Sequence, residues 1–165
     1  MSYQEKRTLS NIFTGIVILA AYCIYAYGQY QSGAAAPDDL KFWAILMLKF
    51  IAFGVVAAIV IQIVFHILLS VGVAVKKTIQ DGQADDKEIE REIKAEMVED
   101  EMDKLISLKA SMVGFIIAGI GFASGLISLA FDYPPFVMLN ILFISFSAGS
   151  LIEGFVQLYF YRKGV

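Results

Sequence analysis

Four long runs of hydrophobic residues, separated by short or charged segments, form the main pattern along this chain. They cover residues 9–29, 42–75, 111–131 and 136–160. Each run is about 20 residues long or longer, which is the length that a helix needs to cross a hydrocarbon core of about 30 Å. Inside a bilayer only helices and closed barrels satisfy every backbone polar group. The pattern therefore predicts an all-α fold, a four-helix transmembrane bundle forming a single membrane domain over residues 1–165.

The connections between the runs predict two antiparallel helical hairpins. Residues 30–41 contain Gly33 and Pro37, and residues 132–135 end in two prolines, so both segments are short and turn-prone. Short connections place consecutive helices side by side in opposite directions. The second run is longer than the others, and at about 1.5 Å per residue it would reach about 50 Å. We expect it to tilt strongly or to extend its last turns beyond the membrane.

Composition agrees with a membrane protein and excludes several other classes. Hydrophobic residues make up 58% of the chain and the mean hydropathy is +0.69, which is too high for an ordinary soluble domain. One cysteine and one histidine exclude an internal disulfide and a Cys/His zinc set. There is no phosphate-binding loop and no basic, aromatic-rich patch. We therefore expect no cofactor, no metal site, no nucleic-acid partner and no enzymatic activity.

The distribution of basic residues predicts the orientation. Of the thirteen Lys and Arg residues, eleven lie near the termini or in residues 76–110, and Lys41 alone lies on the opposite side. By the positive-inside tendency both termini and the middle segment are cytoplasmic. The first run follows Lys6 and Arg7, which is also how a signal peptide begins, but no small-residue cleavage site follows it cleanly. We interpret it as a retained span.

Residues 76–110 form a charged segment that we expect to be helical. Asp85 and Glu88 have the spacing of a helix start, and hydrophobic residues then recur at near-helical spacing up to Leu108. This predicts an amphipathic cytoplasmic helix that runs into the third span, whose apolar side could be covered by the membrane surface, by the second span or by another copy of the chain. Its acidic residues could hold a divalent cation, but interleaved Lys and Arg favour a solvated surface. Residues 85–109 could also bind a cytosolic protein.

Polar residues inside two of the runs are candidates for function. The second run has Gly54, Ala58, Gln62, His66 and Ser70 at successive four-residue steps, and the fourth has Ser145, Gly149, Glu153 and Gln157. His66 and Glu153 lie at a similar depth, so they would meet if their helices were neighbours. Ionisable groups within a span are costly and mark function by default, yet such a pair could also act as structural glue. If functional, Glu153 would accept a proton or cation, with His66 as its partner.

Other polar and small residues in the runs have simpler interpretations. Lys49 is expected to extend toward the membrane surface as an anchor, and Asn140 to form a hydrogen bond between helices. Tyrosines 22, 25, 27 and 30 are explained by packing and interface anchoring. A seam of small residues in the third run allows close helix packing, either within the chain or in a homodimer. It consists of Gly114, Ala118, Gly121 and Gly125.

The stretch Asp100-Glu-Met-Asp-Lys-Leu-Ile-Ser-Leu-Lys-Ala110, which leads directly into the third run, resembles a known group. Small four-span prokaryotic integral membrane proteins of unknown function, common in Firmicutes, carry a similar acidic stretch before their third helix. The likeness extends over most of the chain. It implies a location in the bacterial inner membrane and implies no catalytic residues.

These observations predict a non-enzymatic structural, regulatory or partner-binding membrane protein that forms a homodimer in the lipid bilayer. The alternative is a small transporter or channel for protons or cations that uses His66 and Glu153. A wet cavity reaching Glu153 would favour transport, and a closed pair would favour structure.

Overall fold

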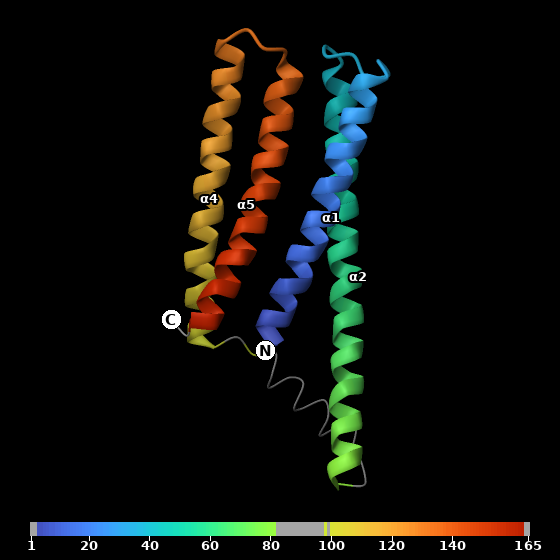
Figure 1. Cartoon of the computed structure of the whole chain (residues 1–165), viewed down its shortest axis with the longest axis vertical. Helices are drawn as coiled ribbons and strands as arrows, with labels where there is room; N and C mark the ends of the chain where they lie inside the picture. Colours follow the sequence, from blue (N-terminus) through green and yellow to red (C-terminus); the bar gives the residue numbers. More distant parts are fainter. Residues whose placement is uncertain (1–2, 82–97, 99, 164–165) are drawn as a thin grey trace.

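The structure is a computed structural model that describes residues 3–81, 98 and 100–163. It contains two antiparallel helical hairpins that lie side by side, and the described residues include no strand (Figure 1). Both chain termini lie at one end of the bundle, here called the termini end, and both hairpin loops lie at the other, the loop end. The predicted all-α four-helix bundle is thus confirmed. Its helices are α1 (Tyr3–Gln31), α2 (Leu40–Asp81), α4 (Glu101–Ala130) and α5 (Pro135–Lys163).

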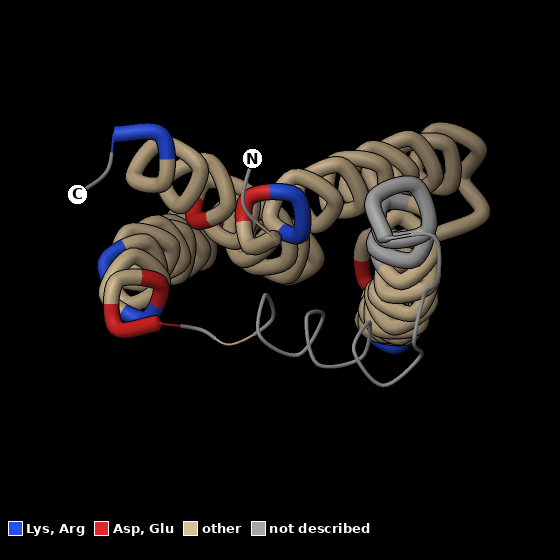
Figure 2. Tube along the Cα trace, turned by 90° about the horizontal axis from the view of Figure 1, so that it is seen from below, with Lys and Arg blue, Asp and Glu red and all other residues tan. Residues whose placement is uncertain are grey.

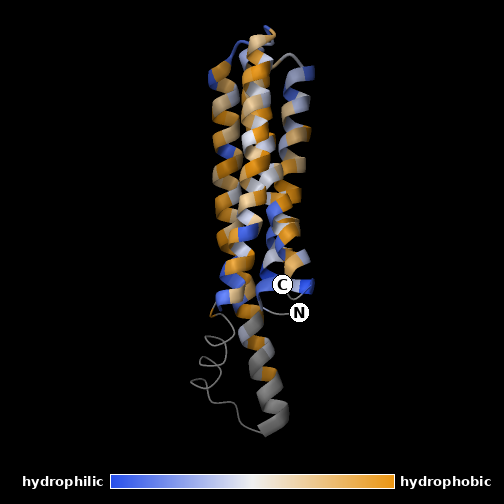
Figure 3. Ribbon diagram, turned by 90° about the vertical axis from the view of Figure 1, so that its left-hand side faces the viewer, coloured by the Kyte–Doolittle hydropathy of each residue, from blue (hydrophilic) through white to orange (hydrophobic). Residues whose placement is uncertain are grey.

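All four helices are long and apolar enough to cross a membrane. Their large hydrophobic side chains mostly point outward: Phe115 is 80% exposed and Phe53 is 70% exposed. Figure 3 shows hydrophobic residues along the outside of the helices, with hydrophilic residues gathered mainly toward their ends. Water would not tolerate so much exposed apolar surface, whereas lipid tails would. The chain is therefore a multi-pass membrane protein.

The second helix is much longer than a membrane span. α2 has 42 residues, or about 63 Å at 1.5 Å per residue. Its last turns extend beyond the termini end of the other three helices (Figures 1 and 3). This agrees with the expectation that the second run would extend its last turns beyond the membrane.

The start of α4 differs from the sequence prediction. The expected helix start at Asp85 lies outside the described residues, but Val98 and Asp100 are not helical. The backbone of Asp100 is extended, and its carboxylate accepts a hydrogen bond from the Asp103 backbone N–H at 2.7 Å. The Asp103 carboxylate in turn accepts from the Asp100 N–H, which completes a capping box. The prediction of a helix that runs into the third span is therefore confirmed from Glu101 onward, but this helix begins at the Asp100 cap and does not continue from Val98.

The small-residue seam packs α4 against α5. Every residue of the seam is buried in α4. A Cβ on Gly149 of α5 would lie 2.8 Å from the Gly114 carbonyl oxygen, and a Cβ on Gly121 would collide with the Ser145 side chain. Backbones can approach this closely only where both surfaces lack side chains. Of the two uses that the sequence allowed, the structure shows packing within the chain.

Helix α1 lies between the two other parts of the bundle at the termini end. Seen from that end, the start of α1 separates α2 from the α4–α5 hairpin (Figure 2). At the loop end α2 does reach α5, where the Trp43 ring stacks on Phe136 with centroids 5.2 Å apart. The core at this end surrounds Tyr22, which is fully buried and packs on Phe50 and Phe143. The bundle is therefore closed by aromatic side chains at the loop end.

A single hydrogen bond between α1 and α5 crosses this aromatic core. The Tyr22 hydroxyl donates to Asn140 Oδ1 at 2.7 Å, as expected for Asn140, and the Asn140 amide donates to the Phe136 carbonyl. We predict that Tyr22→Phe lowers the free energy of unfolding by about 1 kcal/mol, because the Asn140 oxygen loses its donor. The measurement is thermal unfolding in mild detergent. Tyr133→Phe, at an exposed tyrosine, is the control and should unfold as the wild type does; equal melting temperatures for both variants would contradict the prediction.

Candidate functional site

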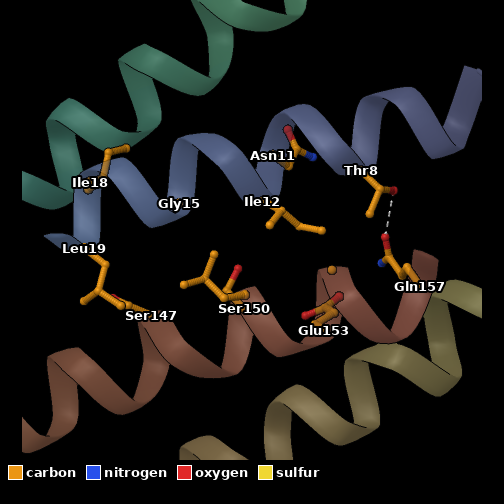
Figure 4. A pocket seen from close by; sticks show the side chains of 12 residues that line it. Thr8, Asn11, Ile12, Gly15, Ile18, Leu19, Ser147, Ser150, Glu153 and Gln157 are labelled. Atoms are coloured by element: carbon orange, nitrogen blue, oxygen red, sulfur yellow. Dashed lines mark hydrogen bonds between the residues drawn. The ribbon is translucent and has the colours of Figure 1, made fainter. Parts of the chain in front are cut away.

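A polar cavity of about 320 Å³ lies between α1 and α5, in the half of the bundle nearer the termini end. It extends along about three turns of each helix, from residues 8–19 of α1 to residues 147–157 of α5. Half of its lining residues are polar, which is unusual between two membrane helices. Figure 4 shows Ile12, Glu153 and the Thr8–Gln157 pair between the two ribbons, whereas Asn11 and Ile18 lie on the side of α1 away from α5 in this view. The polar residues are Thr8, Asn11, Ser147, Ser150, Glu153 and Gln157.

Glu153 is the ionisable residue of this cavity, and its carboxylate is held from α4. The Ser111 hydroxyl donates to Glu153 Oε1 at 2.6 Å. Gly114 makes room for the other oxygen, because a Cβ at that position would lie 3.2 Å from Glu153 Oε2. Glu153 is nine residues from Arg162, or about 13 Å along the helix. The carboxylate therefore lies well inside the apolar part of α5, oriented by a hydroxyl from a second helix.

Interlocking side chains on α1 and α5 form the walls of the cavity. Ile12 fits against Gly154, where an added Cβ would lie 2.6 Å from Ile12 Cγ1, and Leu151 fits against Gly15 at 2.8 Å. At the end nearest the termini the Thr8 hydroxyl donates to Gln157 Oε1 at 3.1 Å (Figure 4). The two helices are thus held together on both sides of Glu153, and the space between them keeps its shape.

The electrostatic setting of Glu153 is unusual for a carboxylate within a membrane span. In the part of the chain that the structure describes, its only hydrogen-bond partner is the Ser111 hydroxyl, and no Lys, Arg or His forms an ion pair with it. The same residues contain no cluster of three metal-binding side chains. Neutral side chains of Ser, Thr, Asn and Gln line the same cavity. Such an arrangement suits a proton or a monovalent cation, because a divalent ion generally requires more than one carboxylate.

The structure does not bring His66 and Glu153 together. His66 lies in a different cavity, between α1 and α2, whereas Glu153 faces α1 from the other side. The expectation of similar depth was also wrong: His66 lies level with Tyr3 and Arg7 of α1, whereas Gly154, next to Glu153, packs on Ile12, further from the termini end. In addition, α1 lies between α2 and the α4–α5 hairpin at the termini end (Figure 2). The expected pair is therefore not formed, and Glu153 stands as a site of its own.

The other polar residues of the two stripes do not share one site. Some face the α1–α2 cavity, one packs on α4, and one bonds α1. Gln62 shares the α1–α2 cavity with His66, and the Ser70 hydroxyl donates to the His66 carbonyl within α2. Ser145 packs on α4, whereas Gln157 bonds α1. A four-residue step on a helix turns by about 40°, so a stripe gradually rotates from one neighbour to the next. The polar residues of each stripe are therefore evenly spaced in the sequence, but they contact different neighbouring helices in the structure.

Sequence reasoning missed five polar residues at the site, namely Ser111, Thr8, Asn11, Ser147 and Ser150. Ser111 lies three residues before Gly114, so it continues the small-residue seam by one turn, and this spacing could have identified it. Thr8 lies just before the first hydrophobic run, so in the sequence it is indistinguishable from the other polar residues of the N-terminal segment. Ser150 follows Gly149 and is off the stripe. A single Ser or Thr hydroxyl in a membrane helix often forms a hydrogen bond with the backbone of its own helix. Its presence in the sequence is therefore weak evidence for a functional site.

The remaining sequence predictions concern anchors and the charged segment. The Lys49 side chain is exposed beside Tyr25 and Phe42, consistent with an anchor. Most of residues 85–109, including the acidic residues before position 98, lie outside the described part of the chain. The interpretation of that segment as a binding surface stays a prediction.

Comparison of the chain with protein-family models, with curated proteins and with solved structures found no match. The resemblance to the Firmicutes-type group therefore stays a prediction. What is known of the site comes from its geometry: a carboxylate that has no basic partner in the part of the chain described, in a polar cavity, within a transmembrane bundle.

Proposed function

We propose that this protein is a small, non-enzymatic transporter or channel that binds protons or monovalent cations at Glu153. The observation that supports this function is the half-buried Glu153 carboxylate, which faces a polar cavity and has no basic partner among the described residues. A charged carboxylate inside a membrane is costly unless a counter-charge or a proton neutralises it. Because the described residues supply no counter-charge there, the neutralising group in this proposal is the transported ion.

The cavity has a polar route on one side and an apolar closure on the other. From Gln157 to Ser147 the lining extends over about 15 Å of α5, toward the middle of the bundle. Beyond it, at the loop end, lie Tyr22, Phe50 and Phe143 of the aromatic core. An ion that enters from the termini end must pass the hydrogen bond between Thr8 and Gln157, while release at the loop end requires the aromatic core to separate. This is the arrangement that alternating access needs.

The proposed location is the inner membrane of a bacterium, with both termini in the cytoplasm. The basic residues at the termini end support this orientation, because positively charged segments stay on the cytoplasmic side. Among the described residues outside the spans, Lys6, Lys104 and Arg162 lie at the termini end, and Lys41 lies at the loop end. Ions would then enter the cavity from the cytoplasm.

A second candidate function is partner binding, with or without a homodimer. Its support is the first part of α4, where Met102, Leu105 and Leu108 are exposed before the hydrophobic run begins. Exposed apolar residues on a charged helix are typical of a docking surface for another protein. The seam that could have joined two copies is already buried against α5, so a homodimer would use other surfaces. Cross-linking through a cysteine at position 105 would detect such an interface.

The test of the proposed function is uptake by proteoliposomes. Purified protein is reconstituted with dyes inside that respond to protons, Na⁺ or K⁺, and a gradient of the matching ion is applied in turn. We expect uptake of at least one of these ions at several times the rate of protein-free vesicles. Protein that is folded and inserted, as shown by protease protection of one end, but moves none of the three ions would contradict the proposal.

A further inference from the structure

The first two turns of α1 close the candidate site at the termini end. Gln4, Thr8 and Ile12 follow one another at four-residue spacing, and each of the three is at most 8% exposed. They therefore form one buried face of α1. This face is directed toward α5, because Thr8 bonds Gln157 and Ile12 fits against Gly154 (Figure 4).

The side-chain amide of Gln4 is buried without a partner. Its Nε2 atom makes no hydrogen bond with any of the residues that the structure describes. Buried donors are nearly always satisfied in folded proteins, and one that is not satisfied costs at least as much free energy as a hydrogen bond contributes. The closed end of the cavity therefore holds an unmade hydrogen bond one helical turn away from the bond between Thr8 and Gln157.

The composition of the first two turns of α1 allows them to separate from α5. Tyr3 is the only hydrophobic residue in residues 3–8, and its ring packs on Phe65 of α2, with the centroids 5.3 Å apart. A movement of these turns away from α5 would therefore carry polar side chains, and little apolar surface, into water. Ile12, one turn after Thr8, stays interlocked with Gly154 and provides a fixed point for such a movement.

We propose that Gln4, Thr8 and Gln157 form a gate at the termini end of the Glu153 cavity. In the closed state, which the structure shows, Thr8 bonds Gln157 and the Gln4 amide is unsatisfied. In the open state the Thr8 bond is broken, and water satisfies the Gln4 amide. Because one hydrogen bond is lost while another is gained, these side chains favour neither state strongly, so both are populated. The role of the gate rests on the proposed ion transport, since it controls access to Glu153.

Entry of a thiol reagent into the cavity tests the gate. Ser150 lines the cavity, and Cys23 is the only cysteine of the chain, so Ser150→Cys in a Cys23→Ala background provides a single thiol inside the cavity. This reference protein is placed in lipid nanodiscs, and a small, water-soluble methanethiosulfonate reagent is added. The labelling rate, followed by mass spectrometry, reports how often the gate opens, because the aromatic core closes the loop end.

Two substitutions on the same face of α1 should change the labelling rate in opposite directions. Gln4→Met removes the unsatisfied donor from the closed state, so we expect labelling to slow at least about fivefold, equivalent to about 1 kcal/mol, with a melting temperature no lower than that of the reference. Thr8→Val removes the bond that holds the gate closed and should speed labelling. Gln31→Met, the same replacement at the exposed last residue of α1, is the matched control and should label at the reference rate.

Labelling of Gln4→Met at the reference rate would overturn the gate, and so would an unchanged rate in Thr8→Val. Should Gln4→Met fail to fold, Gln4→Leu provides the comparison. Ion uptake by the wild type separates the gate from the proposed function. A wild type that moves no ion contradicts transport, while the labelling rates still decide whether the gate exists. Normal uptake by the wild type, together with unchanged labelling in Gln4→Met, contradicts the gate alone.

Discussion

Glu153→Gln is expected to abolish ion uptake, with a loss of at least tenfold in proteoliposomes, while the protein still folds. The glutamine has nearly the same shape, and its amide oxygen can still accept the hydrogen bond of the Ser111 hydroxyl that now lies at 2.6 Å. It carries no charge and takes up no proton at physiological pH. Because the ion site depends on that charge, binding is lost while packing remains. The measurement is the initial uptake rate, compared with the melting temperature of the same preparation.

The matched control for Glu153→Gln is Glu101→Gln. Glu101 is exposed in the first turn of α4 and outside the cavity, so its replacement removes the same charge and should leave uptake unchanged. Glu153→Asp keeps the charge on a shorter side chain and should retain partial uptake. If Glu153→Gln transported as well as the wild type, the ion site would be elsewhere. If it lost several degrees of melting temperature and the wild type moved no ion, the carboxylate would be structural.

Gly121→Ala is expected to cause the largest loss of stability from a single added methyl group. A Cβ at Gly121 would collide with both the Cβ and the hydroxyl of Ser145, so the two helix backbones must move apart. Overpacking of this kind costs about 2 kcal/mol or more, because neither neighbour is the free end of a flexible side chain. The displacement would also affect the Ser111 bond to Glu153, on the same two helices. We therefore expect a lower melting temperature together with slower ion uptake.

Gly119→Ala, two residues away on the same helix, is the control. Nothing lies within 4 Å of a Cβ at Gly119, since this side of α4 faces outward. Alanine has a higher helix propensity than glycine, so the variant should be as stable as the wild type or more stable by up to about 1 kcal/mol. Equal destabilisation by both substitutions would show that the loss of stability arises within α4. The close approach of α4 and α5 would then not explain it.

The fold could be predicted from the sequence because each helix is encoded locally. Hydrophobic length determines that a segment spans the membrane, and the short connections determine that neighbours are antiparallel. The helix ends were less predictable. Helix α1 starts at Tyr3, before the hydrophobic run, because polar residues such as Glu5 are compatible with the first turn of a helix even where they are incompatible with lipid.

The candidate site could be predicted only in part, because a count along each helix fixes neither its level against the next helix nor its neighbours. Counting residues from the charged ends placed Glu153 and His66 at a similar depth, whereas the structure places them at different levels of α1 and on different neighbours. That depends on how α1 packs, through Ile12 at Gly154 and Leu151 at Gly15. Such contacts connect residues more than 130 positions apart, so no local pattern reveals them. The carboxylate was identified from its chemistry, and its neighbours required the structure.

The outward-facing hydrophobic residues determine which parts of the sequence can change freely. Lipid tails rearrange around an apolar side chain of any shape. A lipid-facing position such as Phe115, which is 80% exposed, therefore requires only that its side chain be apolar. Gly121 and Gly149, in contrast, are restricted to the smallest side chain by the helix opposite. In a deep mutational scan, exchanges among Leu, Ile, Val and Phe would be tolerated along the outer faces of α2 and α4. The narrow tolerance would concentrate on a few small residues, most of them glycines.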